Sequence, residues 1–348
     1  MGLGRSLAIK AVTLTLVLFG VLFFTAALIG ATGVSDKLLR AIINEEVRAF
    51  RQSITRQVTD PEALNKAVTE YEQQLIKSYG LDQPWYTRLG SMVLRIIFLD
   101  LGNAKNLQSF SGSKKVSDLI VERIPNTVLL VTTAILINSL IGLLVGPRLA
   151  MKIGSKTDQS FSYFSAISYA LPTWWVGILF ILVFAFYIRL FPFGGMFSTP
   201  PPESEIGKFL DLLWHAALPI TVLVLANVGV SIYVTRTLVI NVSQEDFVTA
   251  AKARGLPENV VRRRYVMRVS APPILTNIIL ALAGSIGGAI LTETVFSWPG
   301  LGSLFYQAIT TSDEALILGL TYIFTLVYVA ARFVLEILYV LLDPRVRI

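Results

Sequence analysis

Long apolar runs separated by clusters of charged residues dominate the chain. An uncharged apolar run of about 20 residues can cross the hydrocarbon core of a bilayer as a helix. A helix is expected because backbone groups in lipid must be satisfied within the segment. Six stretches meet or nearly meet this length: Ala11–Gly30, Ile124–Gly146, Phe161–Ile188, Leu212–Thr235, Pro273–Thr292 and Ala315–Leu342. The pattern therefore predicts an all-α polytopic membrane protein with six transmembrane helices.

Two charges interrupt the last of these runs. Arg332 and Glu336 lie four residues apart in Ala315–Leu342. Residues at this spacing are neighbours on one face of a helix. We therefore expect them to pair with each other.

Composition agrees with a membrane protein and narrows the chemistry. Hydrophobic residues make up 54% of the chain and charged residues 15%, against about 25% charged residues in soluble proteins. The chain has no cysteine and a single histidine, His215, which excludes a disulfide framework and a thiolate or multi-histidine metal site. The net charge of +7 is explained better by membrane topology than by nucleic acid, so we expect lipid contact and no nucleic-acid partner.

Basic residues in the short loops predict the orientation, because Lys and Arg favour the cytoplasmic side. They gather in the loop after the second run, in the loop after the fourth run and in the tail: Arg148, Lys152, Lys156, Arg236, Lys252, Arg254, Arg262, Arg263, Arg264, Arg268, Arg345 and Arg347. The opposite loops offer only Arg189 and Lys208, with Asp313 and Glu314 in the last one. We therefore expect a multi-pass protein of the inner (cytoplasmic) membrane with both termini in the cytoplasm.

This topology divides the chain into three parts. Residues 1–30 form the cytoplasmic N-terminus and first helix, 31–123 an extracytoplasmic segment, and 124–348 a core domain with helices two to six. The extracytoplasmic segment is expected to be mostly helical, with one helix starting at Asp60-Pro61, where Asp suits the cap and Pro the first position. Its role has two compatible interpretations: a cap packed on the membrane domain, or a docking surface for an external binding protein.

The cytoplasmic loop 239–272 contains the strongest local pattern. Ser243 followed by Asp246 resembles a capping box, and Gly255 stands where a left-handed helix cap belongs. These signals predict a short helix over Gln244–Arg254. Pro257 should begin a second, basic helix, which Pro272-Pro273 should separate from the fifth span.

One face of this short helix is small and mostly apolar. Phe247, Ala250, Ala251 and Arg254 recur at helical spacing. The face could pack on the protein's own helix ends, or it could dock in a groove of a partner protein. The residues alone leave both interpretations open.

Several motifs resemble a known family. Thr249-Ala250-Ala251, followed by Gly255, resembles the "EAA…G" signature of permease subunits in binding-protein-dependent ABC importers. The segment from Asp246-Phe247 to Pro273 is similar to the oligopeptide/dipeptide/nickel permease family, and specifically to its OppB/DppB-like subunit. Further matches are Asp100-Leu101-Gly102, Ser168 with Pro172, Trp174 and Gly177, the run Glu293 to Gly302 after Gly287-Gly288, and Asp343-Pro344-Arg345. Thr249 departs from the signature, which has Glu there, and the segment from Asp36 to about Arg88 is longer than the family pattern.

The resemblance implies a type I ABC importer permease fold and a division of labour. The chain would form half of a translocation pathway, with a second permease subunit, two ATP-binding subunits and an external solute-binding protein as partners. ATP and Mg²⁺ would bind the ATPase subunits, and this chain would bind no cofactor. The resemblance implies that the residues coupled to the ATPase are Asp246, Phe247, Thr249, Ala250, Ala251, Arg254 and Gly255. Peptides lead as cargo, with oligosaccharides or nickel as alternatives for the same machinery.

Two further features carry open interpretations. Gly284 and Gly288, with Gly287 beside them, have the spacing of a close helix contact in lipid, either within the subunit or toward a second subunit or the pathway. Glu293 is expected near the outer membrane interface, as a solvated or hydrogen-bonded carboxylate or as a gating or substrate-contacting residue.

Catalytic or nucleotide-binding motifs would indicate an enzyme or an ATPase. The sequence contains no phosphate loop of the Gly-x-x-x-x-Gly-Lys-Ser/Thr type, no His-Glu-x-x-His and no Gly-x-Ser-x-Gly. We therefore predict a transport subunit without catalytic or metal-binding residues. An ion-gradient-driven carrier is the other class considered, and it is disfavoured because the first five apolar runs lack acidic or basic residues near their centres.

Overall fold

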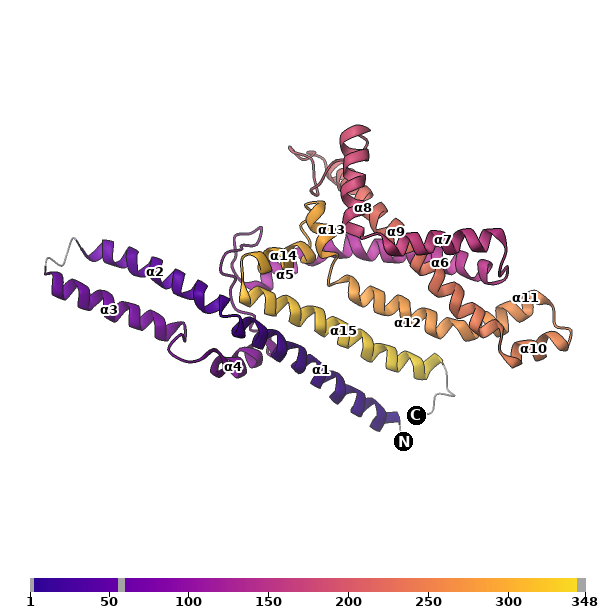
Figure 1. Cartoon of the computed structure of the whole chain (residues 1–348), viewed down its shortest axis with the longest axis horizontal. Coiled ribbons are helices and arrows are strands. Elements are labelled where there is room, and N and C mark those ends of the chain that lie inside the picture. Colours follow the sequence, from indigo (N-terminus) through magenta and orange to yellow (C-terminus); the bar gives the residue numbers. More distant parts are fainter. Residues whose placement is uncertain (1–2, 56–59, 343–348) are drawn as a thin grey trace. The chain divides into compact units, whose positions relative to one another are not determined.

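A computed structural model describes residues 3–55 and 60–342, and within these ranges the regular structure is helical apart from one isolated bridge between Asn103 and Lys115. Three of the helical stretches are π-helical and are labelled η. The elements in chain order (Figure 1) are α1 Leu3–Ala31, α2 Val34–Ile54, α3 Pro61–Ser78, α4 Trp85–Ile97, α5 Val116–Thr127, η1 Val128–Thr132, α6 Thr133–Ala150, α7 Lys156–Ala170, α8 Thr173–Phe180, η2 Ile181–Tyr187, α9 Glu205–Ser243, α10 Asp246–Ala253, α11 Glu258–Val260, η3 Val261–Met267, α12 Arg268–Ser285, α13 Ile290–Val295, α14 Leu301–Thr310 and α15 Glu314–Leu342.

The apolar runs lie in helices, as the sequence predicts. Among the described residues, five helical stretches are long and apolar enough to cross a membrane: Ala8–Ala31, Val116–Ala150, Glu205–Ser243, Glu258–Ser285 and Glu314–Leu338. The pair Lys156–Ala170 and Thr173–Tyr187 makes a sixth if it counts as one span. The structure therefore offers five or six membrane-spanning helices.

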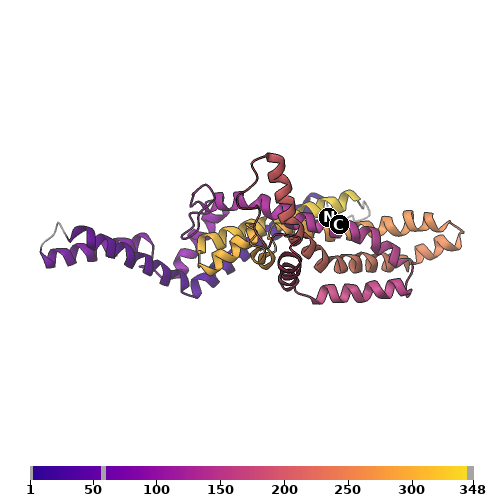
Figure 2. The same cartoon turned by 90° about the horizontal axis from the view of Figure 1, so that it is seen from above.

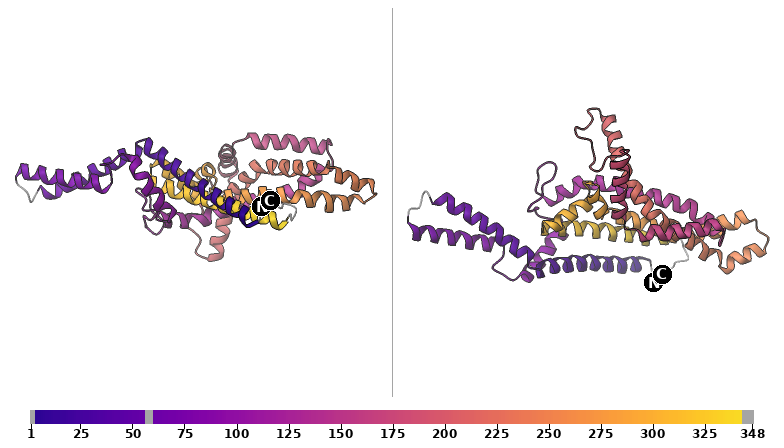
Figure 3. Two further views of the ribbon diagram at one scale, coloured as in Figure 1. Left: turned by 90° about the horizontal axis from the view of Figure 1, so that it is seen from below. Right: turned by 45° about the horizontal axis from the view of Figure 1, so that its top comes forward.

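The third predicted span is broken rather than continuous. Its two helices, α7 and α8, meet at an angle of 92° (Figure 3). The break falls at Leu171, whose backbone is extended with φ −87° and ψ 121°. Pro172 explains this conformation, because a proline disfavours the helical region for the residue before it. The span predicted over Phe161–Ile188 is therefore two helices that meet at a bend rather than one continuous helix.

The fifth predicted span is displaced toward the N-terminus. The helix is continuous from Glu258 to Ser285, so it passes through Pro272 and Pro273, where a break was predicted. Local π-helical adjustment can accommodate proline in such helices, and η3 ends five residues before Pro272. The helix stops at Ser285, before the predicted end at Thr292, because Gly288 has φ +70° and leaves the helical region.

The described chain divides into two compact units that are interleaved along the sequence. Among the described residues, unit 1 comprises 3–11, 121–306 and 326–342, and unit 2 comprises 12–55, 60–120 and 307–325. The helices α1, α5, α14 and α15 each contribute residues to both units. The loop with α10 and the Glu293 motif both belong to unit 1.

Helix α9 is the central element of unit 1 and packs along α6 and α7. Gly142 on α6 permits this, because a Cβ at that position would lie 2.5 Å from the Ser231 hydroxyl oxygen on α9. Arg236 on α9 also donates to Asp158 at the start of α7, with Nη2 2.7 Å from Oδ2. The small residue and the ion pair fix α9 against its two neighbours.

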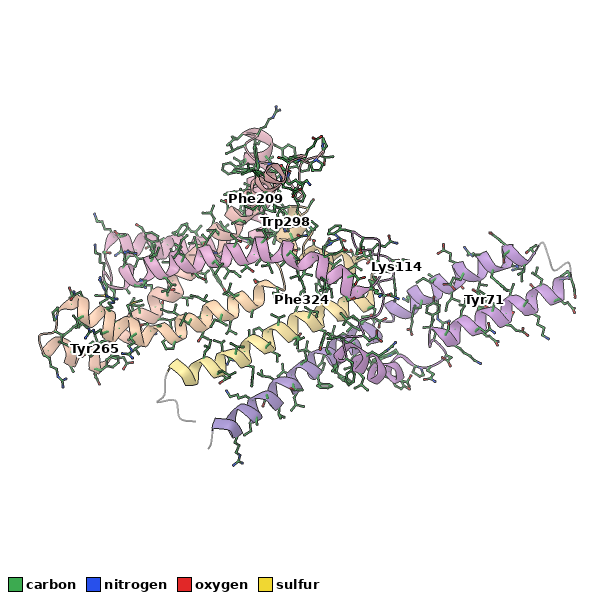
Figure 4. The ribbon with its side chains drawn as sticks, turned by 180° about the vertical axis from the view of Figure 1, so that it is seen from behind. Tyr71, Lys114, Phe209, Tyr265, Trp298 and Phe324 are labelled. Atoms are coloured by element: carbon green, nitrogen blue, oxygen red, sulfur yellow. The ribbon has the colours of Figure 1, made fainter. Side chains whose placement is uncertain are left out.

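An antiparallel helical hairpin forms part of unit 2. Helices α2 and α3 lie side by side (Figure 2), and Phe50 stacks on Tyr71 with ring centroids 4.1 Å apart (Figure 4). The predicted start at Asp60 is confirmed, because its side chain accepts from the backbone N–H of Glu62 at 3.1 Å. Burial and a hydrogen bond to Glu46 raise the pKa of Tyr79 at the end of the hairpin.

The charge in the last span has a different partner from the predicted one. Glu336 accepts from Lys10, with Nζ 2.8 Å from Oε1, rather than pairing with Arg332. Both residues belong to unit 1. The partner of Glu336 is therefore Lys10, a cation 326 positions away in the sequence, and not the predicted helix neighbour Arg332.

Candidate functional site

The loop between α9 and α12 contains the predicted short helix, two residues shorter at its start and one at its end. Glu245 caps α10 with its backbone carbonyl, which accepts from Val248 and Thr249 at 3.0 and 3.2 Å. The predicted capping box is wrong. Helix α9 continues to Ser243, so the Ser243 hydroxyl bonds to Ile240 O at 2.7 Å and lies in the preceding helix instead of at a cap.

The end of α10 is a Schellman motif. The Leu256 N–H donates to Ala251 O at 3.4 Å, and the Gly255 N–H donates to Lys252 O at 2.9 Å. Gly255 has φ +75°, which glycine adopts without the steric penalty of a Cβ. The predicted left-handed cap is therefore confirmed.

One face of α10 packs on neighbouring helices of unit 1, and the opposite face is exposed. Val248 and Ala251 are buried in an apolar cluster with residues from the ends of α6, α9, η3 and α12. The predicted face does not stay together: Ala251 points inward, whereas Phe247, Ala250 and Arg254 are exposed. Asp246 and Thr249 are also exposed, and so is Ala253, which sequence reasoning did not single out. Inward packing and an outward surface therefore coexist on this helix.

The outward surface of α10 combines one acidic residue with small side chains. Successive residues are about 100° apart around a helix, so the direction opposite Val248 and Ala251 falls on Asp246 and Ala253, with Thr249 and Ala250 on either side. Phe247 and Lys252 flank this strip. The role predicted for these residues in ATPase coupling remains a prediction, but their exposure is compatible with it.

The Glu293 motif builds a closed hydrogen-bond network. Glu293 is fully buried, and its carboxylate accepts from the Thr127 hydroxyl at 3.0 Å and from the Ser303 N–H at 2.9 Å. Thr127 in turn accepts from the Leu301 N–H at 2.6 Å. Both side chains therefore satisfy donors in the first turn of α14, which have no partner within their own helix. Of the expectations for Glu293, the hydrogen-bonded carboxylate holds and the solvated one does not.

Two glycines of the motif leave room for this carboxylate. A Cβ at Gly300 would collide with Glu293 Oε2, and one at Gly288 would lie 2.8 Å from Glu293 Oε1. A Cβ at either position would be too close to the carboxyl oxygens for ordinary van der Waals contact, so only glycine fits at these two sites. The spacing Gly-Gly…Glu…Pro-Gly-Leu-Gly in this segment is therefore a packing requirement around one buried carboxyl group.

Sequence reasoning missed the residues that hold the motif from the other side. The side-chain amide of Asn126 donates to Pro299 O at 2.7 Å, and its backbone carbonyl accepts from the indole N–H of Trp298 at 2.9 Å. Trp298, which is labelled in Figure 4, is fully buried. The available signal was a polar pair, Asn126-Thr127, next to Pro125 at the start of an apolar run.

The glycine pair predicted to form a helix contact does not lie on one helix face. Gly284 is in the last turn of α12, whereas Gly287 and Gly288 follow the end of that helix. A Cβ at Gly284 would meet no atom within 4 Å, so this glycine makes no close helix contact within the described part of the chain. The neighbouring Ser285 instead shares a hydrogen bond with Thr132 at 2.9 Å.

The motif around Pro172 shapes the bend between α7 and α8. The Ser168 hydroxyl contacts Leu225 O and Ala226 O on α9, both at 2.9 Å. Gly177 on α8 lies against the ring of Phe296, which a Cβ there would approach to 3.1 Å. The two motifs that carry the resemblance, around Pro172 and Glu293, are therefore in contact. The ending Asp343-Pro344-Arg345 lies outside the described residues.

A cavity of about 730 Å³ opens among α6, α8, α9, α12 and α13 in unit 1. Asn138, Asn227 and Asn277 line it among mostly apolar side chains. Gly288 also lines it, so the cavity reaches the Glu293 motif. No group of three or more His, Cys, Asp or Glu side chains suited to a metal ion occurs among the described residues.

Long apolar helices, a bent span and a loop helix with an exposed face define a multi-pass membrane protein. Residues 138–348 match the family described as "Binding-protein-dependent transport system inner membrane component". The chain belongs to this family, which consists of transport components rather than enzymes, and the match assigns a type I permease domain to it.

Three relatives share most of their length with this chain. It is 30% identical over 274 residues to the oligopeptide transport system permease protein AppB of Bacillus subtilis, covering 79% of this chain and 84% of AppB. It is 30% identical over 285 residues to a putative peptide permease protein of Brucella ovis, covering 82% and 87%. It is 31% identical over 283 residues to the di/tripeptide transport system permease protein DppB of Pseudomonas aeruginosa, covering 77% and 82%.

Proposed function

We propose that the chain is the membrane-spanning permease subunit of an ATP-driven peptide importer in the inner membrane. The family membership carries this proposal, and the names of the relatives supply peptides as the cargo. The subunit would pair with a second permease to enclose the translocation pathway. An external solute-binding protein would deliver the peptide, and two ATPase subunits, which bind ATP and Mg²⁺, would supply the energy.

Helix α10 would transmit the movement of one ATPase to the membrane domain. Val248 and Ala251 attach it to the ends of α6, α9, η3 and α12, so a displacement of α10 would be passed to those helices through packed side chains. The outward strip Thr249, Ala250 and Ala253 would lie in a groove of the ATPase. ATP favours one arrangement of the helices only if the ATPase binds that arrangement more tightly.

The proposed contact predicts a difference between neighbouring alanines. Ala250→Asp places a charge on the exposed strip and should abolish co-purification of the ATPase and peptide uptake, while the thermal midpoint of the purified subunit stays within a few degrees of wild type. Ala251→Asp buries the charge in the apolar cluster, so it should lower the midpoint as well. Asn259→Asp, an exposed position in the same loop, is the matched control and should keep both uptake and ATPase. Normal uptake by Ala250→Asp would refute the contact.

A further inference from the structure

The cavity in unit 1 has the size of a ligand site but a neutral wall. Its volume of about 730 Å³ falls within the range of about 300–1,000 Å³ typical of small-molecule pockets. Among the described residues that line it, none is charged and none is histidine or cysteine. Its polar groups are amides and hydroxyls, so any ligand is recognised by hydrogen bonds and apolar contact.

Three asparagines from three different helices supply the amides. Asn227 on α9 donates through Nδ2 to Leu223 O at 2.9 Å, and Asn277 on α12 donates in the same way to Pro273 O at 3.0 Å. Each bond reaches one turn back along the same helix. The side-chain amide is therefore held to the backbone by one N–H, and its carbonyl oxygen is left as an acceptor.

Asn138 on α6 is the buried member of this set. Only 7% of the residue is exposed, and Nδ2 lies 3.5 Å from Leu223 O, at the limit of a hydrogen bond. Its Oδ1 is buried and has no hydrogen-bond partner among the described residues. An unpaired buried acceptor costs about 1–3 kcal/mol. Because Oδ1 is itself buried, it lies behind the cavity surface, and the accessible amides are those of Asn227 and Asn277.

The chemistry of the lining favours a peptide backbone over the other cargoes considered. A carboxamide offers one acceptor and two N–H donors, which complement the N–H and C=O of a peptide bond. Nickel would require imidazole, thiolate or carboxylate ligands, and the lining has none. Trp174 is the one aromatic side chain among the lining residues.

We propose that this cavity is the part of the pathway where the chain binds its cargo through peptide bonds, with Asn227 and Asn277 as the contacts. This inference rests on the proposed function and adds to it a rule of selectivity. Because the contacts are hydrogen bonds to the peptide backbone of the cargo and the wall carries no charge, the subunit accepts peptides with acidic, basic or neutral side chains alike. Charge preference, where the whole importer has one, comes from other subunits.

The test uses the complete importer reconstituted in proteoliposomes. Initial uptake is measured for three tripeptides of net positive, negative and zero side-chain charge, chosen for equal affinity to the binding protein. Asn227 and Asn277 are exposed on their helices, so substitutions there should leave the fold intact. The variants are Asn277→Asp and the double change Asn227→Leu with Asn277→Leu. Asn65→Asp on α3, also exposed but outside the lining, adds the same charge and is the control.

The expected results separate the two levels of the proposal. Asn277→Asp should shift the uptake ratio of cationic to anionic peptide by about fivefold or more, and Asn65→Asp should leave the ratio unchanged. The double leucine variant should slow all three peptides by a common factor of about tenfold, with ATPase stimulation by the loaded binding protein retained. An unchanged ratio in Asn277→Asp, or normal uptake by the double variant, would overturn only the proposal that this cavity binds the peptide backbone. A wild-type importer that takes up none of the peptides would overturn the proposed function itself.

Discussion

Glu293 is surrounded by donors that come from distant parts of the sequence. Thr127 lies 166 positions before it, and Ser303 lies 10 positions after it. Hydropathy places Glu293 at the edge of a membrane span, where a solvated carboxylate is the natural expectation. Because burial of a charge is tolerated only with such partners, the actual environment depends on tertiary contacts that spacing in the sequence does not encode.

Replacement of this carboxylate should weaken the fold in a specific way. Glu293→Gln keeps the shape but replaces one acceptor with an NH₂ group, which then faces either the Ser303 N–H or the Thr127 hydroxyl. Thr127 already accepts from Leu301, so one donor is left unpaired at a cost of about 1–3 kcal/mol. We expect a lower thermal midpoint of the purified subunit and faster proteolysis around α14. Glu203→Gln, at an exposed position, should behave as wild type, and an equally stable Glu293→Gln would contradict the network.

Gly255 shows how an element boundary can be read from sequence when the cause is local. A left-handed C-cap depends on one residue and on bonds within the same turn, so the glycine signal was sufficient. A Cβ at Gly255 would meet no atom within 4 Å. The cost of a substitution there is therefore conformational rather than steric.

A graded series at this position tests that cause. Asn tolerates the left-handed region better than other non-glycine residues, so Gly255→Asn should be nearly neutral. Gly255→Ala should cost about 1 kcal/mol, and β-branched Gly255→Val more. Trypsin cleavage after Lys252 and Arg254, measured on the intact complex, should accelerate in the order Asn, Ala, Val, and ATPase retention should fall in the same order. Equal behaviour of all three variants would refute the explanation.

Other boundaries required information that hydropathy lacks. The run Pro273–Thr292 stays apolar past Ser285 because Gly287 and Gly288 do not lower it, yet the backbone leaves the helix there. A proline alone does not predict whether a helix breaks: Pro172 breaks a span, whereas Pro272 and Pro273 lie inside a continuous helix. The sequence therefore predicts that these helices exist, but their bends and ends depend on how freed backbone groups are satisfied.

The topology of the whole molecule remains a prediction from the distribution of Lys and Arg. The chain contains no cysteine, so single cysteines can be introduced without removing others. Asn259→Cys in the α10–α12 loop and Gln74→Cys in α3 both replace exposed residues. With an impermeant maleimide on right-side-out vesicles, Gln74→Cys should be labelled and Asn259→Cys should not, and inverted vesicles should reverse the result. Labelling of both from one side would contradict the orientation.

The ion pair between Lys10 and Glu336 has a consequence for biosynthesis. These residues are 326 positions apart, so the ribosome must make all of the sequence between them before the cation of α1 can meet its partner in α15. Until then Lys10 must keep its ammonium group in water by extending along the helix surface, and α1 waits in the membrane without this contact. A chain that stops short of residue 336 never completes it. Helix α15 thereby adds a contact to α1 that only a chain extending past residue 336 acquires.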